Sequence, residues 1–250
     1  MSEKVFAFYS KDRFKDLLSL SEEKISFLKA KEMAPALPKG WHELSTLPKE
    51  LRIEFFYKFW QQTLPYHPRA FEMLSHLFER IEEIHFFLLK EEDSPYFPEC
   101  VYSLKGNETF FRGGVGLTIE EITSFNAKFG GVLPKDYLAF LHIHNGFNRS
   151  SDTGIMKIED IPRNYEKINQ ELHHAVVSQV EPGDLIPFYE CFGLHSYQCF
   201  FKRWHPTSEM GNIHFSSIEK TISSYDDPQA TLAFETFSDW LAFYLEIMES

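Results

Sequence analysis

The spacing of apolar positions divides the first part of the chain into helical segments. Apolar residues three and four positions apart predict one helix that Pro48 opens and a longer one from Pro68 to Glu91. An earlier helix is predicted from Ser10 toward Leu28, and the proline-rich stretch 33–48 is expected to be a loop. Residues 1–93 are therefore predicted to form a small helical bundle or extension.

The period changes after the third predicted helix. Val101–Leu104 and Thr109–Phe111 are rich in β-branched and aromatic residues, and the glycine-containing turn between them is typical of a hairpin. Gly113-Gly114 then marks the predicted boundary between two regions. The predicted division is a helical N-terminal region with a short hairpin, residues 1–112, and a second domain, residues 113–250.

The second region begins with helical signals. Thr118 and Glu121 have the spacing of a capping box at a helix start. Leu133–Phe147 has the features of a complete short helix, because Pro134 suits its first turn and Gly146 accepts the positive φ that ends it. His142 and His144 are two positions apart, so on a helix they point to different faces, and their expected role is at the helix C-terminus.

Strand-like patterns follow, and a final helix is predicted after Thr236. The predicted strands are Gly154–Ile158, Leu185–Glu190, Leu194–Phe201 and Ile213–Phe215, with a helix capped by Asn164 after the first of them. Consecutive strands with short links favour an antiparallel sheet. The predicted fold class is therefore α+β, an antiparallel sheet flanked by helices and preceded by a mostly α-helical N-terminal region.

Charge adds a functional constraint because it is unevenly distributed. The 250-residue chain has a net charge of −12. Residues 1–112 carry 16 basic and 18 acidic residues, whereas residues 113–250 carry 9 and 19. An acidic surface repels nucleic-acid phosphates and anionic membranes and favours a basic protein partner. The alternative interpretation is ordinary surface acidity that keeps the protein in solution.

Cysteine usage and hydropathy predict a cytoplasmic protein. The three cysteines are too few for a disulfide framework, which indicates a reducing compartment. No apolar run reaches the length of a membrane span, so no membrane association is expected. The basic residues are scattered, and we therefore predict no nucleic-acid partner.

Candidate catalytic chemistry is sparse. Cys191, His195, Cys199 and His205 are zinc-compatible residue types, and they define a rival hypothesis, a small metal-dependent or Cys/His hydrolase. Gly193 interrupts this run and paired ligand knuckles are missing, so we assign no metal. The glycine-rich Gly113–Gly116 lacks the lysine and hydroxyl residue of a phosphate-binding loop. We predict no catalytic residues, no cofactor and no enzymatic activity.

Several segments of the second region occur in an order that is typical of one superfamily. They are the helix with Ile122 and Phe125, the string LPKDYLAFLHIHNGF, DLIPFYECFG with the aromatic strand after it, and the closing FETFSDWLAFYL. This part, roughly residues 113–250, resembles the SUKH superfamily, which includes fungal cell-wall-assembly regulators and bacterial toxin-immunity proteins. The resemblance implies a single α+β domain that binds other proteins and has no shared catalytic residues. The long N-terminal region departs from the compact immunity type.

These observations together predict a non-enzymatic protein-interaction module, with immunity or regulation as specific cases. Carboxylates and aromatic side chains near strand ends are the expected docking groups for a basic partner. The predicted partner-binding residues are Asp184, Tyr189, Glu190, Trp204, Asp226 and Asp227. A third hypothesis is a structural subunit that assembles through its N-terminal helices.

Overall fold

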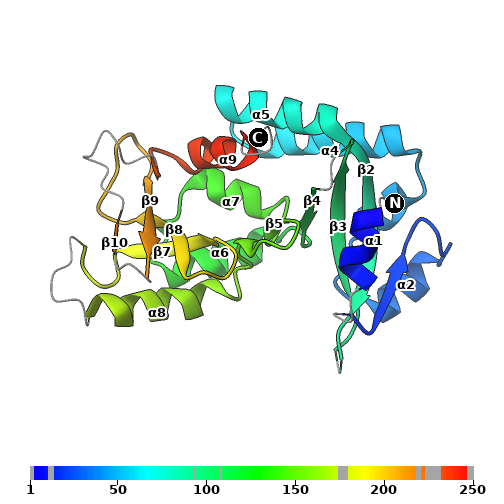
Figure 1. The fold of residues 1–250 in the computed structure, drawn as a ribbon, viewed down its shortest axis with the longest axis horizontal. Helices are drawn as coiled ribbons and strands as arrows, with labels where there is room; N and C mark the ends of the chain where they lie inside the picture. The colour runs from blue at the N-terminus through cyan, green and yellow to red at the C-terminus, as the bar shows by residue number, and fades with distance from the viewer. Residues whose placement is uncertain are drawn as a thin grey trace.

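One antiparallel sheet of eleven strands runs through both predicted regions in the computed structural model (Figure 1). The structure describes residues 3–10, 14–92, 94–106, 109–173, 180–217, 221–222 and 232–246. Strands β1 to β10 neighbour one another in chain order, and β11 pairs with β9. Helices accompany this sheet along its length, so the predicted α+β class is confirmed.

The sheet and its helices have the following bounds. The strands are β1 (Asp16–Ser19), β2 (Ile81–Lys90), β3 (Phe97–Leu104), β4 (Phe110–Gly113), β5 (Phe147–Arg149), β6 (Gly154–Ile155), β7 (Leu185–Glu190), β8 (Ser196–Phe201), β9 (Asn212–Ser216), β10 (Thr221–Ile222) and β11 (Ala233–Phe234). The helices are α1 (Glu3–Ser10), α2 (Phe27–Met33), α3 (Lys39–Ser45), α4 (Lys49–Thr63), α5 (Pro68–Arg80), α6 (Ile119–Lys128), α7 (Lys135–Leu141), α8 (Ile161–His173) and α9 (Phe237–Glu246). Figure 1 shows α4, α5 and α9 together above the sheet and α8 below it.

Strand β2 corrects the predicted helix 68–91. Helix α5 ends at Arg80, and Ile81 is already extended, with φ −63° and ψ 127°. Phe86 packs in the main core, whereas the next residue, Phe87, packs beneath α1 on the other face of the sheet. A strand covered on both faces is apolar at nearly every position, and the residue period does not distinguish such a run from a buried helix.

Two further elements differ from the prediction. Asp16–Ser19 is an edge strand paired with β2, where the sequence predicts part of a helix. Helix α3 occupies part of the predicted loop 33–48 and buries Trp41 and Leu44 in the main core. Helix α3 has seven residues and β1 has four, so each contains only about two repeats of its hydrophobic period, which is too short a pattern to identify the element.

Helix α8 begins at Ile161, so the predicted cap Asn164 lies inside it, and α1 and α2 lie at the two ends of the predicted helix from Ser10 toward Leu28. Several other elements agree with their sequence signals. Helix α4 begins directly after Pro48. Thr118 and Glu121 form the predicted capping box of α6, with both reciprocal hydrogen bonds present. Strands β3 and β4 form the predicted hairpin ladder. The Thr236 hydroxyl accepts a hydrogen bond from the Asp239 amide at the start of α9, at 3.0 Å.

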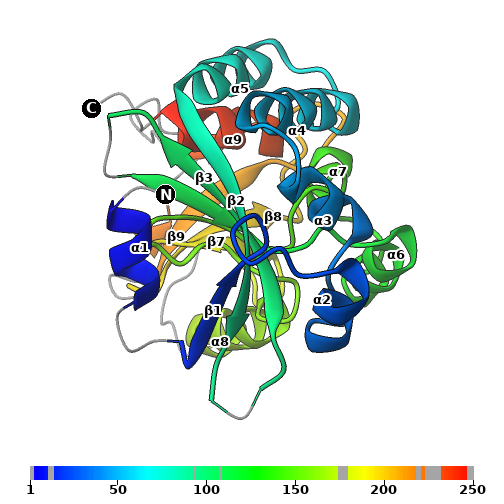
Figure 2. The same cartoon turned by 90° about the vertical axis from the view of Figure 1, so that its right-hand side faces the viewer.

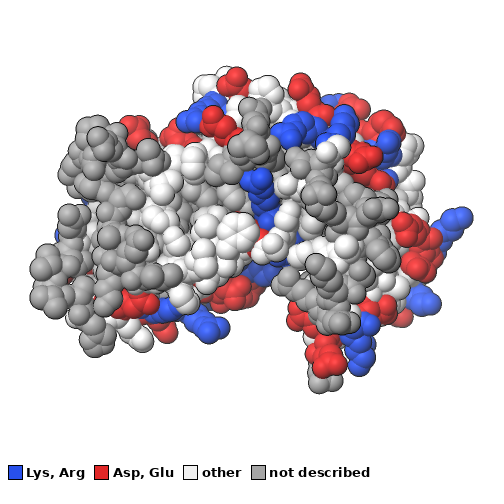
Figure 3. All heavy atoms as spheres, in the orientation of Figure 1, with Lys and Arg blue, Asp and Glu red and all other residues white. Residues whose placement is uncertain are grey.

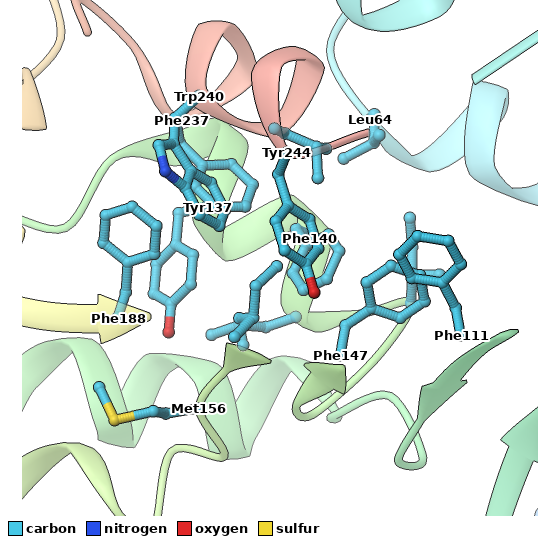
Figure 4. Packing of buried hydrophobic residues seen from close by; sticks show 14 of the residues in the cluster. Leu64, Phe111, Tyr137, Phe140, Phe147, Met156, Phe188, Phe237, Trp240 and Tyr244 are labelled. Atoms are coloured by element: carbon cyan, nitrogen blue, oxygen red, sulfur yellow. The ribbon is translucent and has the colours of Figure 1, made fainter. Parts of the chain in front are cut away.

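Aromatic side chains fill the core around α7 and α9 (Figure 4). The Tyr137 ring lies 5.0 Å from that of Phe200 and 5.2 Å from that of Phe237. The buried carboxylate of Asp136 accepts hydrogen bonds from the amide and hydroxyl of Ser238, at 2.8 and 2.9 Å. Asp136 therefore links α7 to the start of α9. It also accepts a hydrogen bond from the Ser238 amide, which has no acceptor within its own helix.

The sheet crosses the predicted boundary at residue 113 without interruption. Gly113 lies opposite Cys100 of β3 on one side and opposite Phe147 of β5 on the other. Helix α5 packs against α9, where Arg69 and Glu246 form an ion pair. The two regions thus share one sheet and one main core, and their division into separate domains stays a prediction.

The glycines at this crossing allow two backbone segments to approach closely. A Cβ on Gly114 would lie 2.3 Å from the carbonyl oxygen of Asn145, and one on Gly116 would lie 2.0 Å from that of His142. Neither distance is possible for a larger residue, because both partners are backbone atoms. The absence of side chains at Gly114 and Gly116 therefore lets this segment lie directly against residues 142–145, which follow α7.

Candidate functional site

A polar cleft of about 520 Å³ lies where β3 and β4 meet the segment from β5 to α8. Figure 3 shows the molecule hollowed between its two halves, with acidic and basic side chains on either side of the hollow. The charged residues that line the cleft are Glu91, Glu99, Arg112, Asp152, Lys157, Asp160, Arg163, Lys167 and Glu190. Charges of both signs suit a ligand surface that carries several polar groups.

A buried ion pair forms the N-terminal wall of the polar cleft. The Arg112 guanidinium lies 3.5 Å from the Glu99 carboxylate, and its Nε donates to the carbonyl oxygen of Ser150 at 3.0 Å. The phenol of Tyr9 donates to the other oxygen of Glu99. Burial, reinforced by the Glu99 charge, raises the pKa of Tyr9 well above its ordinary value. Both carboxylate oxygens of Glu99 are therefore occupied, and the group serves to position α1.

Helix α8 supplies the basic wall of the cleft. Arg163 and Lys167 are four residues apart, so they lie on one face of the helix. The Lys167 ammonium contacts the ring of His195, and the phenol of Tyr197 donates to the amide oxygen of Asn164 at 3.3 Å. The Arg163 and Lys167 cations can bind a carboxylate, whereas the exposed Glu91, which directly follows β2, can bind a cation.

Lys157 connects the two walls. Its ammonium lies 5.4 Å from the centre of the Phe97 ring on β3. A cation over an aromatic face is attracted by the ring quadrupole. This contact therefore joins two lining residues of the cleft that are distant in the sequence.

The turn between β7 and β8 forms an apolar rim. Phe192 and Leu194 at its tip are 59% and 55% exposed. Phe192 and His195 have left-handed φ values of 47° and 55°, which side chains other than glycine seldom adopt. Such strained conformations are concentrated at functional sites, where the surrounding structure must hold them.

Asp152 is the residue that holds this rim. Its side chain is buried, and its two oxygens accept hydrogen bonds from the Phe192 amide at 2.7 Å and from the Tyr189 phenol at 3.0 Å. Burial, followed by the charge of Asp152, raises the pKa of Tyr189 above its ordinary value. The buried carboxylate therefore holds the strained turn through the Phe192 amide.

The six predicted partner-binding residues are not brought together. Glu190 lines the polar cleft, and Tyr189 beside it is bonded to Asp152. Asp184 lies at the opposite end of β7, where its carboxylate is 2.6 Å from Arg203 Nε. Trp204 packs over Gly211 at that same end of the sheet, and Asp226 and Asp227 lie outside the described residues.

The predicted Cys/His group does not form a ligand set. Cys199 is buried within β8, where it lies opposite Ile213, whereas the ring of His205 is bonded to the carbonyl oxygen of Lys202. Within the described part of the chain, no three His, Cys, Asp or Glu side chains gather in a way that could hold a metal ion. All three cysteines are free thiols.

His144 has a structural role that the sequence did not reveal. The helix predicted through it ends at Leu141, and the imidazole is buried. Its Nε2 lies 2.6 Å from the Tyr102 phenol and its Nδ1 lies 2.7 Å from the carbonyl oxygen of Gly114. Because a carbonyl only accepts, Nδ1 carries the proton and Nε2 accepts from Tyr102. Burial lowers the pKa of His144 to about 4, so the ring is neutral.

Sequence reasoning also missed three residues of the polar cleft. Arg163 and Lys167 have the spacing of a single helical face, a signal that was present but not specific to binding. Asp152 lies in a polar turn sequence, and only the structure shows that its carboxylate is buried and bonded to the rim.

Comparison with known proteins identifies a family for the second region. The model of the SMI1 / KNR4 family (SUKH-1) matches residues 116–242. No curated protein and no solved structure matches the chain. The matched residues include α6 to α8, β5 to β9 and the start of α9, and therefore one wall of the polar cleft together with its rim.

Proposed function

Because the chain belongs to the SMI1 / KNR4 family (SUKH-1), we propose that it is a non-enzymatic module that binds another protein at the polar cleft. The family supports an interaction or immunity-type role, and immunity or regulation is the specific form that we propose. One observation supports the polar cleft as the binding site. The exposed turn at Phe192 has a strained backbone that the buried Asp152 holds in place, and it lies beside charges of both signs.

The partner segment proposed here is basic and carries an apolar side chain. Residues 113–250 have a net charge of −10, which would attract a basic protein from a distance and raise its association rate. Glu91 and Asp160 are exposed in the cleft and would meet its cations, while Phe192 and Leu194 would cover its apolar group. Arg163 would pair with a carboxylate of the partner and so fix its orientation.

The polypeptide carries no helix, among its described residues, of the length and apolar character that a bilayer crossing requires. A cytoplasmic location stays a prediction based on cysteine usage. The hydrolase hypothesis has no assembled Cys/His group to support it among the described residues.

A paired-variant binding experiment tests the proposed function. Full-length wild type, Glu91→Lys and Glu92→Lys are used as baits in native cell extract, at low and high salt. Both glutamates are exposed neighbours, but only Glu91 lines the cleft. We expect a basic protein that is retained by wild type and Glu92→Lys, lost with Glu91→Lys and released by salt. Equal retention by all three baits would exclude the cleft, and retention that salt does not affect would exclude acidic docking.

A further inference from the structure

Helix α4 lies at the periphery of the N-terminal region, beside α5 (Figure 2). One side of α4 packs in the main core, where Phe56 and Trp60 are buried. Its other side carries Leu51 and Phe55, which are 50% and 52% exposed. An ordinary surface helix is apolar toward the core and polar toward solvent. Helix α4 therefore has a second apolar surface that the core of its own chain does not use.

The apolar residues of this second surface form a ridge. Leu51, Phe55 and the half-buried Phe59 follow one another at intervals of four residues, so their side chains lie in one row along α4. Rows with this spacing pack into the grooves of a second helix that crosses at about −50°, the commonest packing of two helices in globular proteins. The α4 ridge, residues 51, 55 and 59, therefore has the form of a helix-packing surface.

The charges beside the α4 ridge are complementary to themselves. Glu54 and Lys58 are exposed and form an ion pair within the helix. When two identical helices pack antiparallel about a two-fold axis, the same flank of each helix meets across that axis. An axis at Phe55 places Glu54 of each copy within two residues, about 3 Å along the helix, of Lys58 of the other copy. Because an ammonium has three donors, each Lys58 can bind both carboxylates.

The distribution of charge favours self-association in this region of the chain. Residues 113–250 have a net charge of −10, so two copies repel each other there, whereas residues 1–112 have a net charge of only −2. Helix α4 lies in this nearly neutral region and outside the family match. Two copies can therefore meet at α4 while their acidic regions stay apart.

We propose that the chain forms a two-fold symmetric dimer in which the α4 ridges of two copies pack antiparallel. A two-fold interface uses the same patch on both copies, so one contact covers both ridges. A single pair of helices buries a small area, and the dimer is therefore weak and depends on concentration. The polar cleft stays open, because no ridge residue lines it, and the proposal does not depend on the function of that cleft.

The test is the molar mass of the full chain in solution, measured by sedimentation equilibrium at increasing concentration. We expect the mass to rise from 29.4 kDa toward twice that value. Phe55→Ser should raise the Kd of the dimer about a hundredfold, because the two-fold axis removes a buried ring from both copies. Ile119→Ser is the matched control, since Ile119 is 69% exposed on α6, and it should leave the Kd unchanged.

Charge reversal tests the antiparallel arrangement. Lys58→Glu gathers like charges at the axis and should raise the Kd about tenfold at low salt, whereas Lys128→Glu makes the same change of net charge on α6 and should have little effect. Glu54→Lys combined with Lys58→Glu should restore the wild-type Kd.

Three results would overturn the proposal. The first is a mass that stays at 29.4 kDa up to about 500 µM, where even a weak dimer is populated. The second is a dimer whose Kd Phe55→Ser does not change, which would place the interface elsewhere. The third is a double variant that associates as weakly as Lys58→Glu alone.

Discussion

The Tyr102 phenol donates a hydrogen bond of 2.6 Å to His144 Nε2 in a site from which solvent is excluded. Tyr102 belongs to β3 and His144 follows α7, so this bond joins the N-terminal region to the family-matched region. Trp60 Nε1 lies 3.3 Å from the same phenol and donates to it, which adds α4 to the network. Every polar atom of the imidazole is satisfied, as a buried polar group requires.

The neutral, buried imidazole makes stability depend on pH. Burial lowers the pKa of His144 from 6.5 to about 4, so between these values the unfolded chain binds a proton that the folded protein does not. Stability contributed by the neutral ring is therefore complete above pH 6.5 and is lost as pH falls toward 4, by about 3 kcal/mol.

His144→Gln should flatten this dependence. Its free energy of unfolding, measured by denaturant titration at several pH values, should fall less steeply than that of wild type below pH 6.5. His85 provides the comparison, because burial also lowers its pKa to about 4 and its own share of the slope remains in the variant. Identical slopes for wild type and variant would mean that His144 is not held neutral.

The glycine-rich crossing gives a stability prediction with a matched control. Gly116→Ala would place a Cβ 2.0 Å from a backbone oxygen, so the variant should lose several kcal/mol of unfolding free energy, about 3 or more. Gly40→Ala has nothing within 4 Å and lies in helix α3, so it should gain about 0.5 kcal/mol. Chemical denaturation measures both, and a tolerated Gly116→Ala would contradict the close approach.

Asp152→Ala should release the rim of the polar cleft. The change leaves the Phe192 amide and the Tyr189 phenol without their acceptor, at a cost of about 2 kcal/mol. Hydrogen exchange of the Phe192 amide should accelerate relative to wild type. Glu166→Ala, on the exposed face of α8 and outside the cleft lining, should leave that amide unchanged. Unaltered exchange in Asp152→Ala would mean that the carboxylate does not hold the turn.

Residues 113–250 should not form a stable protein alone. Removing residues 1–112 deletes most of β4, the strand that pairs with β5. It also removes Trp60, so the rings of Phe140 and Phe147 that pack against it lose this contact. It also leaves His144 without Tyr102. We expect this fragment to be aggregated or to unfold without a cooperative transition in circular dichroism. A monomeric fragment with a sharp transition would show that the second region is a self-sufficient domain.

Elements whose signals lie in neighbouring residues can be predicted from the sequence. The prediction is wrong where burial on both faces, and not a local signal, determines the type of element. The capping box at Thr118 and the proline before α4 depend on neighbouring residues, and both are present as predicted. The apolar pattern predicts a helix over β2 because both faces of this strand are covered, which removes the alternation that marks a strand. Nothing local indicates that Ile81 leaves the helix.

The candidate site illustrates the same limit. The sequence predicts both Glu190 and Asp184 as binding residues, but only Glu190 lines the polar cleft, whereas Asp184 at the other end of β7 is paired with Arg203. Strand-end position alone therefore does not group residues into one site. The contact of Lys157 with Phe97 joins distant segments and becomes visible only when the sheet is assembled.

Site-specific photo-crosslinking measures most directly whether the polar cleft binds a protein. A photoreactive residue replaces Ser151, an exposed residue of the cleft lining, or Glu166, an exposed residue of α8 outside the lining, and both full-length baits are irradiated in native extract. We predict a single protein crosslinked at position 151, absent at position 166 and lost when purified wild type competes. Crosslinks of equal yield at both positions, or none at position 151, would contradict the account.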